Sequence, residues 1–100
     1  MLDASRKAIA ACRGSTRESL AQNELLVLAL TRLIEIVGEA AKNVSEETRG
    51  RYPGVPWRAI AGTRDRLIHG YFDVELDHLW IIVSHDLPQL VVDLQGTESL

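Results

Sequence analysis

The segment from Asn23 to Val44 constrains the fold most strongly, because its apolar residues recur at helical spacing along its whole length. Asn23 suits the N-cap of such a helix. The apolar positions cover more than one stripe: Leu25, Leu26, Leu28, Leu30, Leu33, Ile34, Ile36, Val37 and Ala40. A helix of this kind makes two contacts, one with its own core and one elsewhere, such as a partner chain. Small residues near the end of this segment allow another helix to approach closely: Gly38, Ala40 and Ala41.

A shorter helix is expected before this segment. Residues 2–12 carry a modest apolar stripe, and Gly14 breaks the pattern after them. Ser15 or Thr16 can then cap a short turn, and Glu18 stands at the capping-box spacing from Ser15.

The second half of the chain also has helical spacing. Ser45 begins a short turn, and Pro53-Gly54 forces a loop before the next helix. A closing helix is expected over residues 74–94, in which Pro88 predicts a kink or local break near residues 84–85.

Length and composition indicate one globular domain over residues 1–100. The chain is 46% hydrophobic and 25% charged, with three prolines, which is unlike a disordered protein. No repeat, low-complexity tract or alternating strand pattern is present. We therefore predict an all-α helical bundle of four main helices plus one or two short ones. So small a domain gains stability from an oligomer interface, and the two-sided helix predicts a homodimer.

Several classes of protein are excluded or disfavoured. The single cysteine, Cys12, excludes an internal disulfide, and no Cys/His cluster has metal-ligand spacing. The acidic start shows no signal peptide, and the longest apolar run, residues 25–30, is far short of the roughly 20 residues that span a bilayer. These features predict a cytoplasmic protein with no membrane partner. The net charge of −3 argues against a general nucleic-acid coating protein.

The charge distribution nevertheless favours a phosphate ligand. Five arginines stand between residues 49 and 69, against one acid: Arg49, Arg51, Arg58, Arg64 and Arg66. Arginine is the side chain best shaped for bidentate phosphate contact. The alternative, a solvated helix face, is equally consistent with the positions of Arg49 and Arg51.

The most informative motif lies in residues 56–72, which are expected to form one helix with Pro56 at its first position. Asp65 and His69 are four residues apart and share a face, so the carboxylate can fix the tautomer of the imidazole. Arg64 and His69 are five apart, about 140° round a regular helix. Spacing alone does not bring them together; a long side chain, a loosened helix end or a second subunit must do so.

These side chains suit acid–base chemistry on a phosphodiester. His69 can take and give protons at neutral pH, and Arg64 can hold a phosphate and stabilise its growing negative charge. Asp65 either orients His69 or pairs with a neighbouring arginine such as Arg66. Tyr71 can stack on a base or bond a phosphate oxygen. No carboxylate pair or His/Cys cluster could hold a catalytic ion, which predicts metal-independent cleavage.

The motif Arg64-Asp65 … His69-Gly70-Tyr71 resembles the Arg-x4-His-x-Tyr signature of HEPN domains, and within them that of the HepT-like toxins. The arginine and histidine spacing alone would be weak. Three further segments also resemble that family, so that the resemblance covers nearly the whole chain: residues 37–43, 52–57 and 86–88.

The resemblance implies an endoribonuclease toxin of a type II/VII-like toxin–antitoxin system, with its site in a homodimer cleft. It implies an antitoxin partner, an MNT-type minimal nucleotidyltransferase that attaches adenylate to Tyr71. The chain itself would need no cofactor, since ATP and magnesium belong to that partner. The resemblance also places Glu39 near the site, although a solvated glutamate is the alternative.

A second function fits the same residues. The chain could be a non-catalytic accessory subunit that presents nucleotide or substrate to a nucleotidyltransferase. Plain structural dimerisation leaves the cluster of Arg64, Asp65, His69 and Tyr71 unexplained. RNA cleavage in EDTA separates the first two functions.

Overall fold

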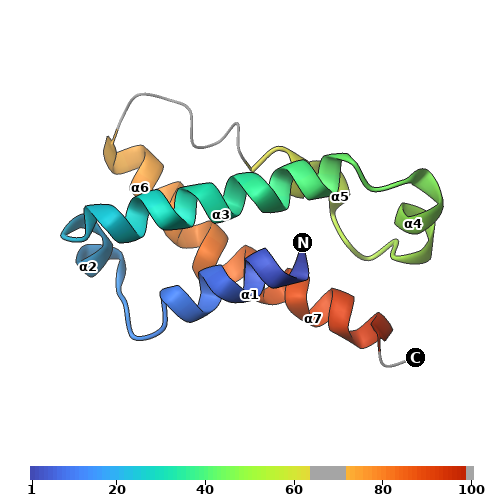
Figure 1. The fold of residues 1–100 in the computed structure, drawn as a ribbon, viewed down its shortest axis with the longest axis horizontal. Helices are drawn as coiled ribbons and strands as arrows, with labels where there is room; N and C mark the ends of the chain where they lie inside the picture. The colour runs from blue at the N-terminus through green and yellow to red at the C-terminus, as the bar shows by residue number, and fades with distance from the viewer. Residues whose placement is uncertain (64–71, 99–100) are drawn as a thin grey trace.

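Three long helical segments form the body of the fold in the computed structural model, which describes residues 1–63 and 72–98 and, beyond residue 63, the side chains of 76–94 (Figure 1). They are α1 (Leu2–Ala11), α3 (Glu24–Lys42) and a C-terminal rod of α6 (Phe72–Ile81), the π-helical segment η2 (Ile82–Asp86) and α7 (Leu87–Glu98). Among the described residues, three short helices lie between them: α2 (Arg17–Ala21), α4 (Glu46–Arg51) and α5 (Trp57–Ala61). The described residues contain no strand, so the predicted all-α fold is confirmed.

The long helix α3 is the centre of the arrangement, and α1 and α5 both pack against it. Asn23 caps its start as expected, since its side-chain oxygen accepts a hydrogen bond from the Leu26 N–H at 3.1 Å. Glu24 in the first turn and Lys42 in the last turn complement the helix dipole. The predicted helix over residues 23–44 is therefore confirmed within two residues.

The core lies where α1, α3 and the C-terminal rod meet. Helix α1 contributes the small residues Ala4 and Ala8, which let its backbone come close to its neighbours. The other two elements contribute larger side chains that are almost fully buried: Leu30, Ile34 and Val37 from α3, and Leu76, Leu79, Ile82, Leu87 and Leu90 from the rod. Burying a side chain of this size contributes about 1.5–3 kcal/mol, so these residues dominate the stability of the fold.

The C-terminal rod departs from α-helical geometry where Pro88 predicts it. Residues Ile82–Asp86 form a π-helical segment, directly before the proline whose ring and missing N–H disturb the preceding turn. The Ser84 hydroxyl also donates to the Trp80 carbonyl, a bond that bends helices. The predicted local break near residues 84–85 is thus confirmed. The helix begins at Phe72 rather than at residue 74 and continues to Glu98.

Two local predictions were wrong. The capping box before α2 is formed by Thr16 and Ser19, whose side chains and backbone N–H groups bond reciprocally, and not by Ser15 and Glu18. Of the two expected caps, Thr16 is confirmed, because it has extended backbone and directly precedes the first helical turn.

The second concerns the helix expected over residues 56–72. It ends at Ala61, and Gly62 and Thr63 form a turn. Glycine is a poor helix former, and the Thr63 hydroxyl bonds backward to the Ile60 carbonyl at 2.8 Å. Pro56 is the N-cap of this helix and not its first residue.

No helix in residues 1–63 and 72–98 combines the length and the apolar composition needed to cross a membrane.

Candidate functional site

The four motif residues predicted to carry the chemistry, Arg64, Asp65, His69 and Tyr71, fall within residues 64–71, outside the described part of the chain. Their roles, and the 140° separation of Arg64 and His69, stay predictions. The structure describes the frame on either side of them: Thr63 before the segment and α6 after it.

The residues that precede the motif are held in place by a close contact between α3 and the end of α5. Thr63 is only 2% exposed. A Cβ added to Gly38 would lie 3.2 Å from the Thr63 Oγ1 and 3.4 Å from the Ile60 carbonyl oxygen. The absence of a side chain at Gly38 therefore lets the two backbones approach, as the small residues on this side of α3 predicted.

Trp57 fixes the other end of α5. The residue is 7% exposed, and its indole Nε1 donates to the Tyr52 carbonyl at 3.1 Å. Such a satisfied N–H allows the ring to be buried at low cost. Trp57 is therefore a core aromatic, and it holds α5 against the loop before it.

On the far side of the segment, α6 is joined to α2 by an ion pair. The Arg17 Nε donates to the Asp77 Oδ1 at 2.8 Å. Two further side chains of α6, Leu76 and Leu79, are buried in the core. The described residues on both sides of the motif segment are thus packed against other helices: Thr63 against α3, and α6 against α2.

Glu39 lies on the exposed side of α3, one residue after Gly38. Its Oε1 accepts a hydrogen bond from the Asn43 Nδ2 at 3.5 Å. Around it is a groove of about 490 Å³ lined by Arg32, Glu35, Ile36, Glu39, Ala40 and Asn43. This position is accessible to a ligand or partner, and a contact between Glu39 and the motif residues stays a prediction.

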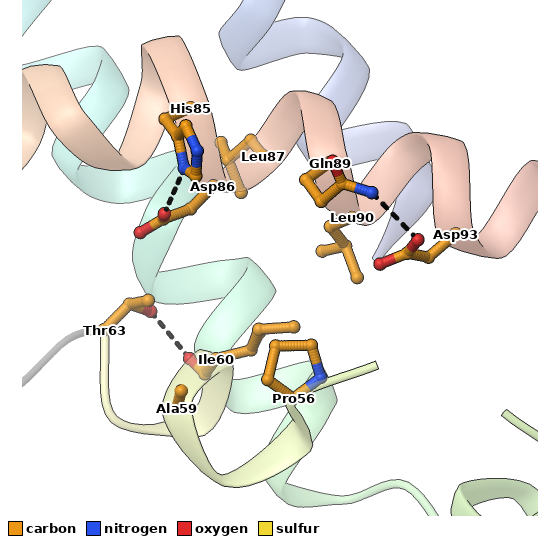
Figure 2. A pocket seen from close by; sticks show the side chains of 10 residues that line it. All are labelled: Pro56, Ala59, Ile60, Thr63, His85, Asp86, Leu87, Gln89, Leu90 and Asp93. Atoms are coloured by element: carbon orange, nitrogen blue, oxygen red, sulfur yellow. Dashed lines mark hydrogen bonds and ion pairs between the residues drawn. The ribbon is translucent and has the colours of Figure 1, made fainter. Parts of the chain in front are cut away.

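A cavity of about 300 Å³ lies between α5 and the C-terminal rod (Figure 2). It is lined by Pro56, Ala59, Ile60, Thr63, His85, Asp86, Leu87, Gln89, Leu90 and Asp93. Thr63, the last described residue before the motif, is part of its wall. No direct signal along the chain marks this cavity, because its two walls are far apart in sequence; only the predicted break at Pro88 falls on one of them.

Comparison with known proteins assigns the chain. The family model described as "Ribonuclease HepT-like" matches residues 1–95, which include the whole motif. The chain belongs to the HepT-like ribonuclease family.

Several curated relatives support this membership. The chain is 40% identical over 78 residues to a putative RNase of Caldanaerobacter subterraneus subsp. tengcongensis, covering 78% of the chain and 70% of the relative. It is 45% identical over 62 residues to a probable ribonuclease HepT of Thermococcus cleftensis, covering 62% of the chain and 56% of the relative. A putative RNase of Methanocaldococcus jannaschii is 34% identical over 89 residues, 82% of the chain and 74% of that protein. No solved structure matches the chain significantly.

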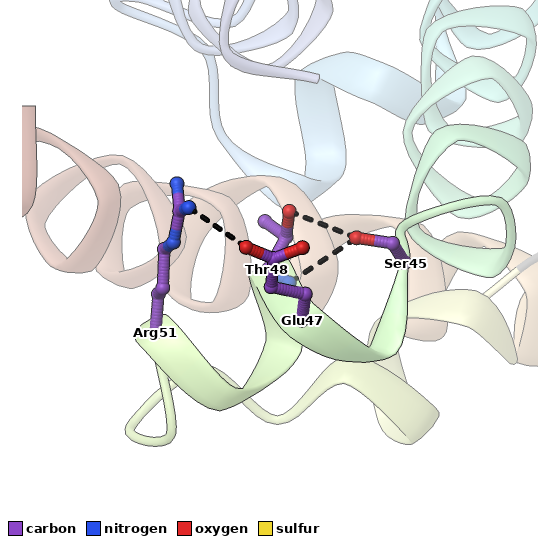
Figure 3. A network of polar contacts seen from close by, with 4 residues as sticks. All are labelled: Ser45, Glu47, Thr48 and Arg51. Carbon is purple, nitrogen blue, oxygen red and sulfur yellow. Dashed lines mark hydrogen bonds and ion pairs between the residues drawn. The ribbon is translucent and has the colours of Figure 1, made fainter.

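Arg49 and Arg51, two of the clustered arginines in the described part of this HepT-like chain, have structural partners. The Arg49 Nη2 donates to the Ala41 and Lys42 carbonyls, at 3.1 and 3.4 Å, and so caps the C-terminal end of α3. The Arg51 Nη2 donates to the Glu47 Oε1 at 3.0 Å, one turn away on α4 (Figure 3). The solvated-face alternative therefore fits the exposed Arg51, whereas Arg49 is half-buried and acts as a helix cap.

The other reactive side chains that the structure describes form no second cluster. Burial raises the pKa of the Cys12 thiol, so the thiol stays protonated and unreactive. The His85 Nδ1 lies 3.1 Å from the neighbouring Asp86 Oδ1. Within residues 1–63 and 72–98, no group of three or more His, Cys, Asp or Glu side chains could hold a metal ion.

Proposed function

We propose that this HepT-like chain is a metal-independent endoribonuclease toxin of a type II/VII-like toxin–antitoxin system, acting in the cytoplasm. One observation carries the proposal: the match to the HepT-like ribonuclease family spans residues 1–95 and includes an intact Arg64, His69 and Tyr71 motif. The names of the relatives, which are putative or probable ribonucleases, support the same activity.

Cleavage would use the 2′-hydroxyl of the RNA as the nucleophile. His69 takes the proton of that hydroxyl, and the 2′-oxygen attacks the adjacent phosphorus. The bond from phosphorus to the 5′-oxygen breaks, and that oxygen leaves with the proton that the protonated His69 gives back. Arg64 stabilises the negative charge that grows on the phosphate, and Asp65 orients His69. The products are a 2′,3′-cyclic phosphate and a 5′-hydroxyl.

A homodimer would complete the site. The outer side of α3 carries large apolar side chains in solvent: Leu25 is 80% exposed, Leu28 59% and Ile36 38%. Lone exposed apolar residues are common, but a row of them on one helix is typical of an interface. A second copy would cover this row and could supply Arg64 or His69 across the cleft. Glu39, on the exposed side of the same helix, would support the site from its rim.

A partner nucleotidyltransferase would neutralise the toxin by transferring adenylate from ATP to Tyr71, using its own magnesium. The tyrosine oxygen attacks the α-phosphorus of ATP, and pyrophosphate leaves. The added phosphate and purine would occupy the site meant for RNA by pairing with Arg64 and by steric block.

Incubation of the purified chain with mixed RNAs in EDTA tests the proposed activity. We expect wild-type protein to cleave RNA and the His69→Ala variant to lose at least about a hundredfold in rate, the usual contribution of a general base. Circular dichroism and sedimentation of the variant check that it is folded. A wild type that binds nucleotide but cleaves no RNA would instead indicate the accessory-subunit function.

A further inference from the structure

We propose that the cavity between α5 and the C-terminal rod binds a guanine base of the RNA, next to the phosphate that is cut. The inference rests on the proposed ribonuclease function and adds a base preference to it. At about 300 Å³ the cavity is at the lower end of small-molecule sites, a size that suits one base rather than a larger ligand.

The walls of the cavity favour a flat ring with polar edges. Ile60 on one side and Leu87 and Leu90 on the other provide apolar surface for the faces of a ring (Figure 2). The described lining contains no lysine or arginine and carries two aspartates. A phosphate would be repelled there, whereas the N–H groups of a base would be attracted. The charge therefore assigns the cavity to a base and not to the backbone of the RNA.

Two side chains one turn apart on α7 define which base fits. The Gln89 Nε2 donates one hydrogen to the Asp93 Oδ1 at 3.0 Å (Figure 2). An amide nitrogen has a second hydrogen, and a carboxylate accepts several bonds. The pair therefore presents a donor beside an acceptor along one edge of the cavity.

Guanine complements this edge. Its O6 can accept from Gln89, and its adjacent N1–H and N2–H groups can donate to Asp93. Adenine and cytosine place an unprotonated ring nitrogen beside their amino group, and uracil flanks its one N–H with two carbonyls. Each of these three bases can still pair one N–H with Asp93 and one acceptor with Gln89, but none of them offers the carboxylate the two adjacent N–H groups of guanine. The Asp93 charge is thus the main determinant of selectivity.

The cavity is placed to act on the reaction. Thr63 lines it and directly precedes Arg64 in the chain. Its other wall includes part of η2, and π-helical turns often occur at functional sites. A base held here would set which phosphodiester reaches the motif, with guanine at one fixed position relative to the cut.

Titration of the labelled full chain with guanosine, adenosine, cytidine and uridine tests the binding, followed by NMR shifts of the Gln89 side-chain amide and the Ile60 and Leu90 methyl groups. We expect guanosine to bind at least about tenfold more tightly than uridine, since a good bidentate pair discriminates by about 1–3 kcal/mol. Asp93→Asn should remove this preference, and Glu46→Gln, the same chemical change on the distant helix α4, should keep it.

Cleavage sites mapped on one long RNA give the second readout. Wild type and Glu46→Gln should cut at a fixed distance from guanine, while Asp93→Asn should still cut but with that preference lost. Equal binding of all four nucleosides, or identical cleavage maps for wild type and Asp93→Asn, would overturn the guanine pocket. Guanosine binding at the cavity without any RNA cleavage would leave the pocket standing and contradict the ribonuclease function instead.

Discussion

Gly38 of α3 lies directly against Thr63, the residue that leads into the motif, so that a Cβ on the glycine would come 3.2 Å from the Thr63 Oγ1. The contact ties the longest helix of the domain to the start of the segment that carries Arg64 and His69. Substitutions at this contact should therefore affect both stability and catalysis.

Gly38→Val should lower the free energy of unfolding by about 1–3 kcal/mol, because the branched side chain overpacks a contact with the Ile60 backbone. The matched control is Gly50→Ala in α4, where nothing lies within 4 Å of an added Cβ. That change should raise stability by up to about 1 kcal/mol through helix propensity. Urea denaturation measures both, and a neutral Gly38→Val would show that the two backbones are not held together.

Arg49 and Arg51 allow a comparison of two arginines from the same short helix. Arg49→Met should cost about 1.5–3 kcal/mol, because it removes a charged donor from two carbonyls at the end of α3. Arg51→Met should cost less than about 1 kcal/mol, because its partner Glu47 is exposed. Equal losses in urea denaturation would mean that Arg49 does not act as a helix cap.

Leu28→Glu should convert the expected dimer into a monomer. Leu28 is 59% exposed, so the introduced carboxylate would stay in water in a monomer and would be buried only in a dimer interface. Val92→Glu changes a similarly exposed residue, at 61%, on α7 and should leave the dimer intact. Sedimentation velocity at micromolar concentration distinguishes the two. A wild type that is already monomeric would contradict the homodimer and the composite site.

Tyr71 should be the residue that the partner modifies. After incubation with the partner nucleotidyltransferase, ATP and magnesium, intact-mass spectrometry should show one or more added adenylates on wild type and none on Tyr71→Phe. The control Tyr52→Phe should still be labelled, because Tyr52 is a half-buried residue in the loop before α5. Labelling of Tyr71→Phe to the same extent would place the modification elsewhere.

Local sequence signals predicted the helices that carry strong periodicity and caps. Asn23 and the apolar spacing after it located α3, and Pro88 located the π-helical break, because each acts within one or two turns. The end of α5 at Ala61 was missed: apolar periodicity continued through Gly62 and Thr63, but the packing of Thr63 on Gly38 decided the turn.

The site was only partly predictable for a similar reason. The motif stands in one short stretch of sequence and was visible, whereas the cavity joins Ile60 to Gln89 and Asp93 through tertiary packing. The structural task of Arg49 likewise depends on the fold, which brings α4 beneath the end of α3. No pattern along the chain encodes such contacts.

The chemistry of the cut tests the central claim most directly. A labelled RNA and a copy whose 2′-hydroxyls are replaced by hydrogen are incubated with the protein in EDTA, and the ends of the products are determined by mass spectrometry. We predict that only the RNA is cut, and that its fragments end in a 2′,3′-cyclic phosphate and a 5′-hydroxyl, as expected for His69 and Arg64 acting on the 2′-hydroxyl. Equal cleavage of both substrates, or activity that is lost in EDTA and returns with magnesium, would contradict it.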